Sequence, residues 1–321
     1  MKSLEYLDRE LERNAALLLV DIVPWLIAPK AWKARRRLCA AFKDYFDLAG
    51  HEGGSDLLAM RYRSFLGAGL THEEIAYAEV PLIVGLLTNT VPAAFWVHFE
   101  LFSRPKLLEE IRGEIEQNAL SIAPDGTHII DLGYLCDNCP LLLSMYQEVL
   151  RMRTTMVTIR FVTQDIVLAD NYFLRSGTML FMPAKQLGRH QSAWGTSADK
   201  FNERRFMRST TTVNDNGDKR KDPRRTGGFM AFGVSPTICP GRHFSTSEIL
   251  ALVAMIALRY DIAPVDQLWC APPRMNSATT SNMSPVEGKF PVTVKKRQKY
   301  GGKLWQFKIT EGKGQFGFAV G

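Results

Sequence analysis

The chain has 321 residues, of which 46% are hydrophobic and 23% are charged, so it can bury a sizeable core and is not expected to be disordered. Its net charge of +7 is compatible with an acidic partner, a membrane surface or nucleic acid. The two basic clusters, residues 33–37 and 219–225, lack the interleaved aromatic side chains with which single-strand binders stack bases. We therefore expect no nucleic-acid partner. Each cluster is interpreted first as a solvated face, and otherwise as a docking site for an acidic redox partner.

The five cysteines are scattered and odd in number, which favours reduced thiols and an intracellular protein over a disulfide framework. Cys136 and Cys139 form a CxxC pair, but no second pair lies near enough to complete a zinc site. We interpret this pair as a turn that leads into a helix. No run of about 18 apolar residues free of charge and proline is present, so no transmembrane helix is expected, and the amino terminus does not resemble a signal peptide.

Helical patterns dominate the first half of the chain. A capping box, Thr71 to Glu74, opens a long apolar segment that continues past Pro92 toward Pro105. Pro92 should kink this helix, because proline lacks a backbone donor and clashes with the preceding turn. Residues 107–120 predict a second, exposed helix, and a third helix is expected from about residue 138, with a proline in its first turn.

Short β-rich runs follow. Residues 158–162, 166–168 and 178–182 predict one small sheet, in which residues 169–172 form a turn. Polar, glycine-bearing sequence at 209–228 predicts a flexible loop. Residues 244–260 predict a buried helix, because they are apolar on most faces, and the tail from residue 272 carries strand and turn signals.

The cysteine loop just before this buried helix carries the chemistry. Cys239 lies in a turn with proline and glycine, where backbone N–H groups and the positive end of the helix dipole favour the thiolate. An aromatic residue, Phe232, precedes it by seven positions, and Gly241 follows by two. A glycine there would let a flat cofactor approach the backbone closely.

This loop resembles the haem-binding loop of cytochromes P450. The matching residues are Phe232, Gly233, Cys239 and Gly241, whereas Ser235 and Thr237 stand where the family has a second glycine and a basic residue. These two departures concern one contact to a haem propionate. The resemblance implies haem b as cofactor, with Cys239 as the axial ligand of the iron.

Two further segments resemble the family's buried charge triad. Glu148 and Arg151 match the ExxR motif, whose spacing puts both side chains on one helix face. Residues 201–206 resemble the meander, in which Arg205 is the matching arginine and Glu203 replaces the usual proline. By themselves the first two residues could form an ordinary surface ion pair. The resemblance instead implies a structural triad beneath the cysteine loop, where each buried charge needs a partner.

The long apolar segment resembles the family's distal helix. Alignment on Trp96 and Pro105 places Thr88 where the family usually has an acid and Asn89 where it has threonine. The resemblance makes both candidate catalytic residues and is closest to the branch that contains the sterol 7α- and 12α-hydroxylases and prostacyclin synthase. Asn89 could instead solvate the backbone of a helix kink near Pro92.

The order of these segments implies the fold class, mainly α with small β-sheets, as in a cytochrome P450 fold that lacks its N-terminal part. Arg160 stands where the family commonly has an arginine on a haem propionate. We expect a single catalytic domain over residues 1–321. Its parts are the roof helices of the substrate pocket (1–70), the distal helix (71–104), the ExxR helix, sheet and meander (138–206), the cysteine loop and buried helix (229–260) and a β-rich tail (261–321).

The function implied is that of a haem-thiolate monooxygenase, because thiolate donation to the iron favours O–O cleavage. Its substrate would be an apolar small molecule, sterol-like or a secondary metabolite, and its electrons would come from NADPH through NADPH-cytochrome P450 reductase. Two alternatives stay open: an electron-independent peroxide isomerase or dehydratase, and a truncated, non-catalytic remnant. Association with the endoplasmic reticulum membrane is expected only if a full-length form carries an anchor, and a cytoplasmic location otherwise.

Overall fold

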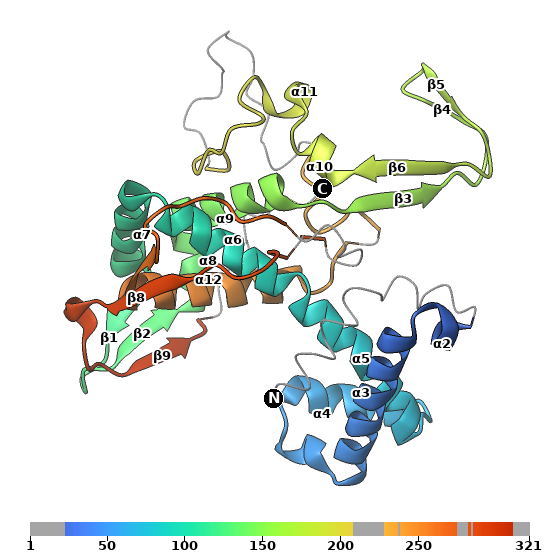
Figure 1. Ribbon diagram of the computed structural model, residues 1–321, viewed down its shortest axis with the longest axis horizontal. Helices are drawn as coiled ribbons and strands as arrows, with labels where there is room; N and C mark the ends of the chain where they lie inside the picture. Colours follow the sequence, from blue (N-terminus) through green and yellow to red (C-terminus); the bar gives the residue numbers. More distant parts are fainter. Residues whose placement is uncertain (1–22, 208–227, 237, 275–281, 284, 311–321) are drawn as a thin grey trace. The chain divides into compact units, whose positions relative to one another are not determined.

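The computed structural model describes residues 23–207, 228–236, 238–274, 282–283 and 285–310. The chain divides into two compact units (Figure 1). The first contains residues 1–91 and 274–287, and the second contains residues 92–273 and 288–321. Each unit is described by itself below, and the expectation of a single catalytic domain stays a prediction.

The first unit is helical. It consists of α2 (Pro24–Ile27), α3 (Pro29–Asp47), the 3₁₀ helix η1 (Gly50–Gly53), α4 (Asp56–Gly67) and α5 (His72–Leu87). One face of α3 is small and apolar, and packs on α5 through a cluster of Ala28, Ala31, Ala34, Leu38, Cys39 and Val80. The opposite face exposes Lys33, Arg36 and Arg37, so the first basic cluster lies on an exposed helix face, which fits both of its interpretations.

The long apolar segment forms two helices, α5 and α6 (Thr90–Phe102), with a break at residues 88 and 89. The capping box at the start of α5 is confirmed, since Thr71 Oγ1 accepts the N–H of Glu74 and the Glu74 carboxylate accepts the N–H of Thr71. Pro92 lies in the first turn of α6, four residues after Thr88, so its ring would clash with the Thr88 carbonyl in a continuous helix. The predicted kink is therefore an interruption just before the proline. Among the described residues, the stretch His72–Phe102 is apolar enough to cross a membrane by length and composition, with 39% of its most apolar window buried.

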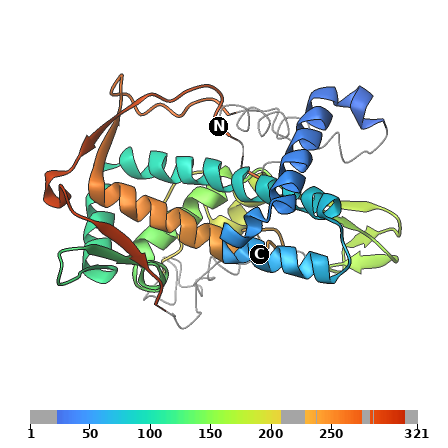
Figure 2. The ribbon, with the colours of Figure 1, turned by 90° about the horizontal axis from the view of Figure 1, so that it is seen from below.

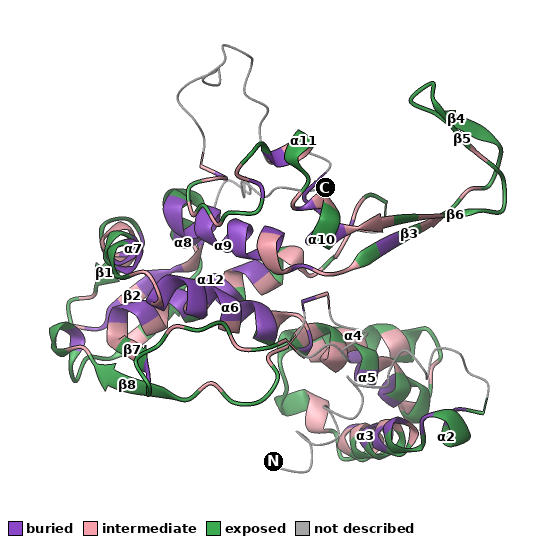
Figure 3. Cartoon of the chain, turned by 45° about the horizontal axis from the view of Figure 1, so that its top comes forward, coloured by how far each residue is buried: buried purple, intermediate pink, exposed green. Residues whose placement is uncertain are grey.

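The core of the second unit is built from helices. These are α6 from Pro92 onward, α7 (Pro105–Asn118), α8 (Leu132–Asn138), α9 (Pro140–Arg153) and α12 (Arg242–Arg259). Every residue of α9 from 141 to 151 is buried, and the buried surfaces of α6, α9 and α12 meet at the centre (Figure 3). Figure 2 shows α6 and α12 running side by side. The predicted helices at 107–120, near 138 and at 244–260 are thus confirmed as α7, α9 and α12.

In the described part of the chain, four small sheets lie around these helices. The first joins β1 (Leu120–Ile122), β2 (His128–Asp131) and β9 (Trp305–Lys308), in which β2 runs antiparallel to β1 and parallel to β9. The others are antiparallel ladders of β3 (Val157–Phe161) with β6 (Met179–Pro183), β4 (Ile166–Leu168) with β5 (Tyr172–Leu174), and β7 (Tyr260–Pro264) with β8 (Val292–Lys296).

The single sheet expected between residues 158 and 182 is wrong in two respects. The segment forms two separate ladders, and Tyr172, which was assigned to a turn, begins strand β5. The sequence analysis also missed the short helices α10 (Ala184–Leu187) and α11 (Gln191–Trp194). The predicted flexible loop at 209–228 lies outside the described residues, except for its last glycine.

Candidate active site

Cys239 ends a tight loop that leads into α12. Its N–H donates to the carbonyl of Phe232 at 2.8 Å, which closes the loop on itself. Gly233 makes the turn with φ +80°, a conformation that a side chain would strain. The Arg242 side chain then donates to the Cys239 carbonyl at 3.0 Å, in the first turn of α12. The half-buried sulfur therefore lies at the N-terminal end of an 18-residue helix, where the dipole favours an anion.

The residues of this loop fit a flat, thiolate-ligated cofactor. A Cβ added at Gly241 would meet the Cys239 sulfur at 3.9 Å and, its two chain neighbours aside, no other atom of the described residues within 4 Å, so the backbone beside the sulfur is open on that side. Among the described residues no group of three or more His, Cys, Asp or Glu side chains could hold a metal ion. One sulfur with an open backbone beside it matches the donor set of a haem held by a single axial thiolate.

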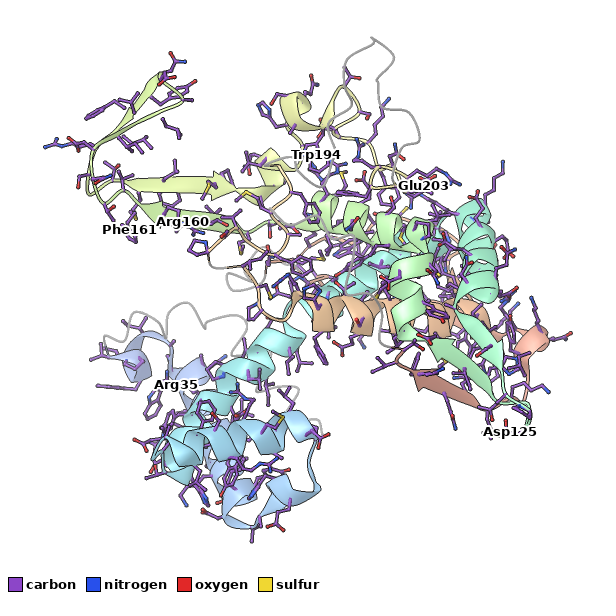
Figure 4. All side chains as sticks on the ribbon, turned by 180° about the vertical axis from the view of Figure 1, so that it is seen from behind. Arg35, Asp125, Arg160, Phe161, Trp194 and Glu203 are labelled. Carbon is purple, nitrogen blue, oxygen red and sulfur yellow. The ribbon has the colours of Figure 1, made fainter. Side chains whose placement is uncertain are left out.

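Arg160 reaches this loop from the strand β3. Its guanidinium donates to the carbonyls of Val234 at 3.1 Å and Ser235 at 3.4 Å, and also to its own strand at Ile159. Figure 4 shows Arg160 and its neighbour Phe161 on β3. The structure therefore places the predicted propionate ligand beside the cysteine loop. Of the two departures from the family pattern, Ser235 is exposed and Thr237 lies outside the described residues.

Glu148, Arg151 and Arg205 form one buried network. Two nitrogens of Arg151 donate to the two oxygens of Glu148 at 2.7 and 2.8 Å, and Arg205 Nε lies 3.1 Å from both oxygens. The side chains of Glu148 and Arg151 are fully buried, and that of Arg205 is 8% exposed. A shared carboxylate between two guanidiniums is a geometry in which buried charges can be satisfied.

Backbone groups of residues 188–202, before and at the start of the meander, complete this network. Arg151 donates to the carbonyls of Gly188 and Ala198, and Arg205 to those of Ser197 and Lys200. The carboxylate of Glu148 also accepts the N–H of Asn202 at 2.9 Å. The triad thus ties this segment to α9. Figure 4 labels two residues of this part of the chain, Trp194 and Glu203.

A second set of contacts links the meander to the cysteine loop. Ser144 of α9 accepts the N–H of Phe206 at 3.0 Å, and the ring of Phe206 meets that of Phe229 edge to face at 5.3 Å. Phe229 is buried and begins the segment that leads to Cys239. These contacts connect α9, through the meander, to the start of the segment that leads to the cysteine loop.

Thr88 and Asn89 lie at the break between α5 and α6. The Thr88 hydroxyl is buried and donates to the Val84 carbonyl at 2.8 Å, so it serves the end of its own helix. The side-chain carbonyl of Asn89 accepts the N–H of Asn282 at 2.6 Å. Both residues belong to the first unit and Cys239 to the second, so their catalytic role stays a prediction.

The cysteine pair marks a junction between helices, as predicted. Cys136 lies in α8 and Cys139 is the residue before α9, and both are buried. Burial raises the pKa of the Cys136 thiol to about 11 and raises that of Cys139 as well, so both remain protonated thiols near neutral pH.

The sequence analysis missed two polar contacts of α9. The carboxylate of Glu114, on α7, accepts the N–H groups of Leu141 and Leu142 at 2.9 Å each and so caps α9 from another helix. Tyr146 shares a hydrogen bond with Thr246 of α12. Each partner lies more than 20 residues away in sequence, so no local pattern signals either contact.

Comparison with known proteins agrees with this geometry. The family model described as "Cytochrome P450" matches residues 6–281. The chain is 36% identical over 319 residues to the cytochrome P450 monooxygenase nodJ of Hypoxylon pulicicidum, with 96% of this chain and 60% of the relative covered. It is 30% identical over 279 residues to the cytochrome P450 monooxygenase calL of Penicillium decumbens, covering 82% of this chain and 51% of the relative.

A third relative, the cholesterol 7-alpha-monooxygenase of Cricetulus griseus, is 27% identical over 269 residues, which cover 79% of this chain and 52% of the relative. The chain thus spans between about half and 60% of the length of these curated relatives. The mainly helical architecture with small sheets is the predicted fold class, which is confirmed. On the family match and on the ordered cysteine loop, ExxR helix and meander, the chain belongs to the cytochrome P450 family.

Proposed function

We propose that the protein is a haem-thiolate monooxygenase that oxidises an apolar small molecule, sterol-like or a secondary metabolite. The observation that carries this proposal is the position of Cys239, on a closed loop at the N-terminus of α12 in a chain of the cytochrome P450 family. The printed names of its relatives, fungal monooxygenases and a cholesterol 7-alpha-monooxygenase, support the reaction class and the apolar substrate.

The chain's own residues would divide the work as follows. Cys239 would ligate the iron, and the open backbone at Gly241, with Phe232 and the turn at Gly233, would lie against the haem. Arg160 would bind a propionate beside the loop, while Glu148, Arg151 and Arg205 would keep the scaffold rigid. When bound, haem with a thiolate ligand supplies activation of dioxygen for attack on C–H bonds.

We further propose that Asn89 orients a water molecule or the substrate for proton delivery, with Thr88 holding the end of α5. An amide can both donate and accept, but it does not titrate. Its carbonyl already accepts one hydrogen bond, from Asn282, so its amide N–H groups would contact the water. Proton delivery would then be slower than in a protein with an acid and a threonine at these positions.

Electrons would come from NADPH through NADPH-cytochrome P450 reductase. The net charge of +7 supports docking of an acidic redox protein. For a longer form with a membrane anchor we propose the surface of the endoplasmic reticulum, and the cytoplasm for a form without one.

The decisive experiment is the absorption spectrum of the reduced, CO-bound protein, for the wild type and for Cys239→Ala and Cys239→His. The wild type should show the band of thiolate-ligated haem and both variants should lose it, because only a charged sulfur donates enough electron density to the iron. Cys270→Ala is the matched control, since Cys270 is also a free thiol and is exposed. A wild type without the thiolate band, or a variant that retains it, would contradict the proposal.

Product analysis then separates monooxygenase from isomerase chemistry. The protein is supplied either with reductase, NADPH and dioxygen, or with a hydroperoxide alone. Product that forms only with reductase supports the monooxygenase. Product from the hydroperoxide without reductant would show an isomerase or dehydratase instead.

A further inference from the structure

A buried pair of hydroxyl groups joins α9 to α12. Tyr146 Oη and Thr246 Oγ1 lie 3.0 Å apart, although the two residues are 100 positions apart in sequence. Tyr146 is 1% exposed and Thr246 is not exposed at all. Burial also raises the pKa of Tyr146, so the phenol stays protonated and can donate or accept.

Most of the pair's neighbours along the two helices are apolar. On α12 its neighbours along the buried face are Ile249, Leu250 and Val253, and on α9 they are Leu142, Met145 and Val149. A hydroxyl in such surroundings costs free energy unless it is hydrogen-bonded, so each group needs the other. The hydrogen bond therefore favours one position of α12 along α9. Apolar packing alone would allow neighbouring positions at a smaller cost in free energy.

Tyr146 and the charge triad lie on opposite sides of α9. Tyr146 and Glu148 are two residues apart, roughly 200° around the helix axis, so they face opposite sides of α9. Glu148 holds the meander on one side, and Tyr146 holds α12 on the other. Thr246 is the fifth residue of α12 and follows Cys239 by seven positions.

The cysteine loop is consequently attached to α9 at both ends. Its front is held through Ser144, Phe206 and Phe229, and its rear through Thr246 and Tyr146. Cys239 lies between these two attachments in the sequence, and its N–H donates to the carbonyl of Phe232. A change of register at Thr246 would move the first turn of α12 and the sulfur with it.

We propose that Tyr146 is a positioning residue for Cys239: by bonding Thr246 it sets the first turns of α12, and thereby the sulfur, relative to α9. The inference rests on the proposed function in that Cys239 ligates haem. Tyr146 itself contacts neither the sulfur's backbone nor the loop glycines through any hydrogen bond described above. The hydrogen-bonded route from Tyr146 to Cys239 therefore passes through Thr246.

The experiment uses the full chain loaded with haem and five variants, one of them a control. Tyr146→Phe and Thr246→Val each remove one hydroxyl at nearly constant shape, and Tyr146→Phe/Thr246→Val removes both. Thr246→Ser keeps the hydroxyl. Tyr134→Phe is the matched control, because Tyr134 lies on α8 and is exposed.

Two quantities are measured: the share of the reduced, CO-bound protein that shows the thiolate band, and the hydrogen-exchange rates of peptides covering residues 238–246 and 105–118. Both single variants should lower the thiolate share and accelerate exchange at 238–246 about fivefold or more, because one buried hydroxyl is left unpaired. Exchange in α7 should not change. Thr246→Ser and Tyr134→Phe should match the wild type, and the double variant should lose less than the sum of the single variants.

Wild-type values for both single variants would overturn the proposal. So would equal acceleration at 238–246 and in α7, because that would show a general loss of stability and no local effect on the cysteine turn. If the wild type lacks a thiolate band, the proposed function fails, and exchange at 238–246 still tests the positioning role by itself.

Discussion

The surroundings of α9 and the break between α5 and α6 satisfy their polar groups in different ways. Around α9 the charged atoms of Glu148 and Arg151 are fully buried and are matched by a second arginine and by backbone carbonyls of the meander. At the break, Thr88 bonds its own helix and Asn89 bonds the N–H of Asn282. In both regions the polar side chains have hydrogen-bond partners. Only the side chains around α9 are charged.

This difference between the two regions explains why the structural role of ExxR can be predicted from sequence and that of Thr88 and Asn89 cannot. A buried carboxylate without its arginines would be strongly unfavourable, so ExxR on a buried helix admits few structures. Threonine and asparagine near a proline can serve either a ligand or a helix end at similar cost. Substitutions in the two regions, and at the start of α5, test this contrast, and their expected effects decrease from α9 to the start of α5.

The largest effect is expected for Glu148→Ala. It leaves Arg151 and Arg205 buried without their shared carboxylate, so the free energy of unfolding should fall by about 3–5 kcal/mol and haem retention should fall with it. Chemical denaturation measures the change. Glu110→Ala is the control, because its ion pair with Arg204 is about half exposed on both sides and should contribute less than about 1 kcal/mol. Equal costs for the two variants would show that the triad is no stronger than a surface pair.

A smaller effect is expected for Glu114, which caps α9 from α7. Glu114→Ala should cost about 1 kcal/mol, because the N–H groups of Leu141 and Leu142 lose their acceptor. Glu114→Gln keeps a carbonyl oxygen there and should cost less. If both variants cost the same, the oxygen is not the cap.

The pH dependence of the same site has a definite sign. Burial raises the pKa of Glu114 above its usual range, against the two N–H bonds that lower it. The native state therefore holds this proton more tightly than the unfolded chain does. The contribution of Glu114 to the free energy of unfolding is greatest below the ordinary glutamate pKa of about 4.3, and it declines as pH rises through the raised value. Unfolding experiments across that range should show wild type losing stability relative to Glu114→Gln as pH increases.

At the α5–α6 break, Asn89→Leu should free the Asn282 N–H at a cost of about 1 kcal/mol, whereas Asn89→Asp keeps an acceptor. Hydrogen exchange of the Asn282 amide should accelerate in the first variant and not in the second. Turnover should also fall strongly in Asn89→Leu while the haem spectrum is unchanged. If this variant matches wild type in turnover, Asn89 serves only the backbone.

The smallest effect is expected at the start of α5. Hydrogen bonds from Thr71 hold the pKa of Glu74 below its usual range, and the carboxylate is exposed. Its contribution is therefore complete above the ordinary glutamate pKa of about 4.3 and is lost as pH falls through the lower folded value. Thermal unfolding at decreasing pH should show a steeper loss for wild type than for Glu74→Gln. Parallel curves would mean that the capping box does not contribute to stability.

Local sequence determined much of the helical fold. The capping box at Thr71, Pro140 in the first turn of α9 and the apolar faces of α12 each specify a helix through contacts within a few residues. The strands were less predictable: β5 begins at Tyr172, inside a turn signal, because its pairing with β4 and not its own pattern makes it a strand. A helix carries its hydrogen-bond partners in its own sequence, and a strand does not.

The distinction between local and distant partners also applies to the candidate site. The sequence by itself determined the family, the cysteine turn and the i, i+3 pair of Glu148 and Arg151, because these depend on neighbouring residues. Only the tertiary structure decided that Asn89 bonds Asn282, that Glu114 caps α9 and that Tyr146 meets Thr246. Those partners lie between 27 and 193 positions apart, and a polar group buried in folding bonds whichever group the packing brings within reach.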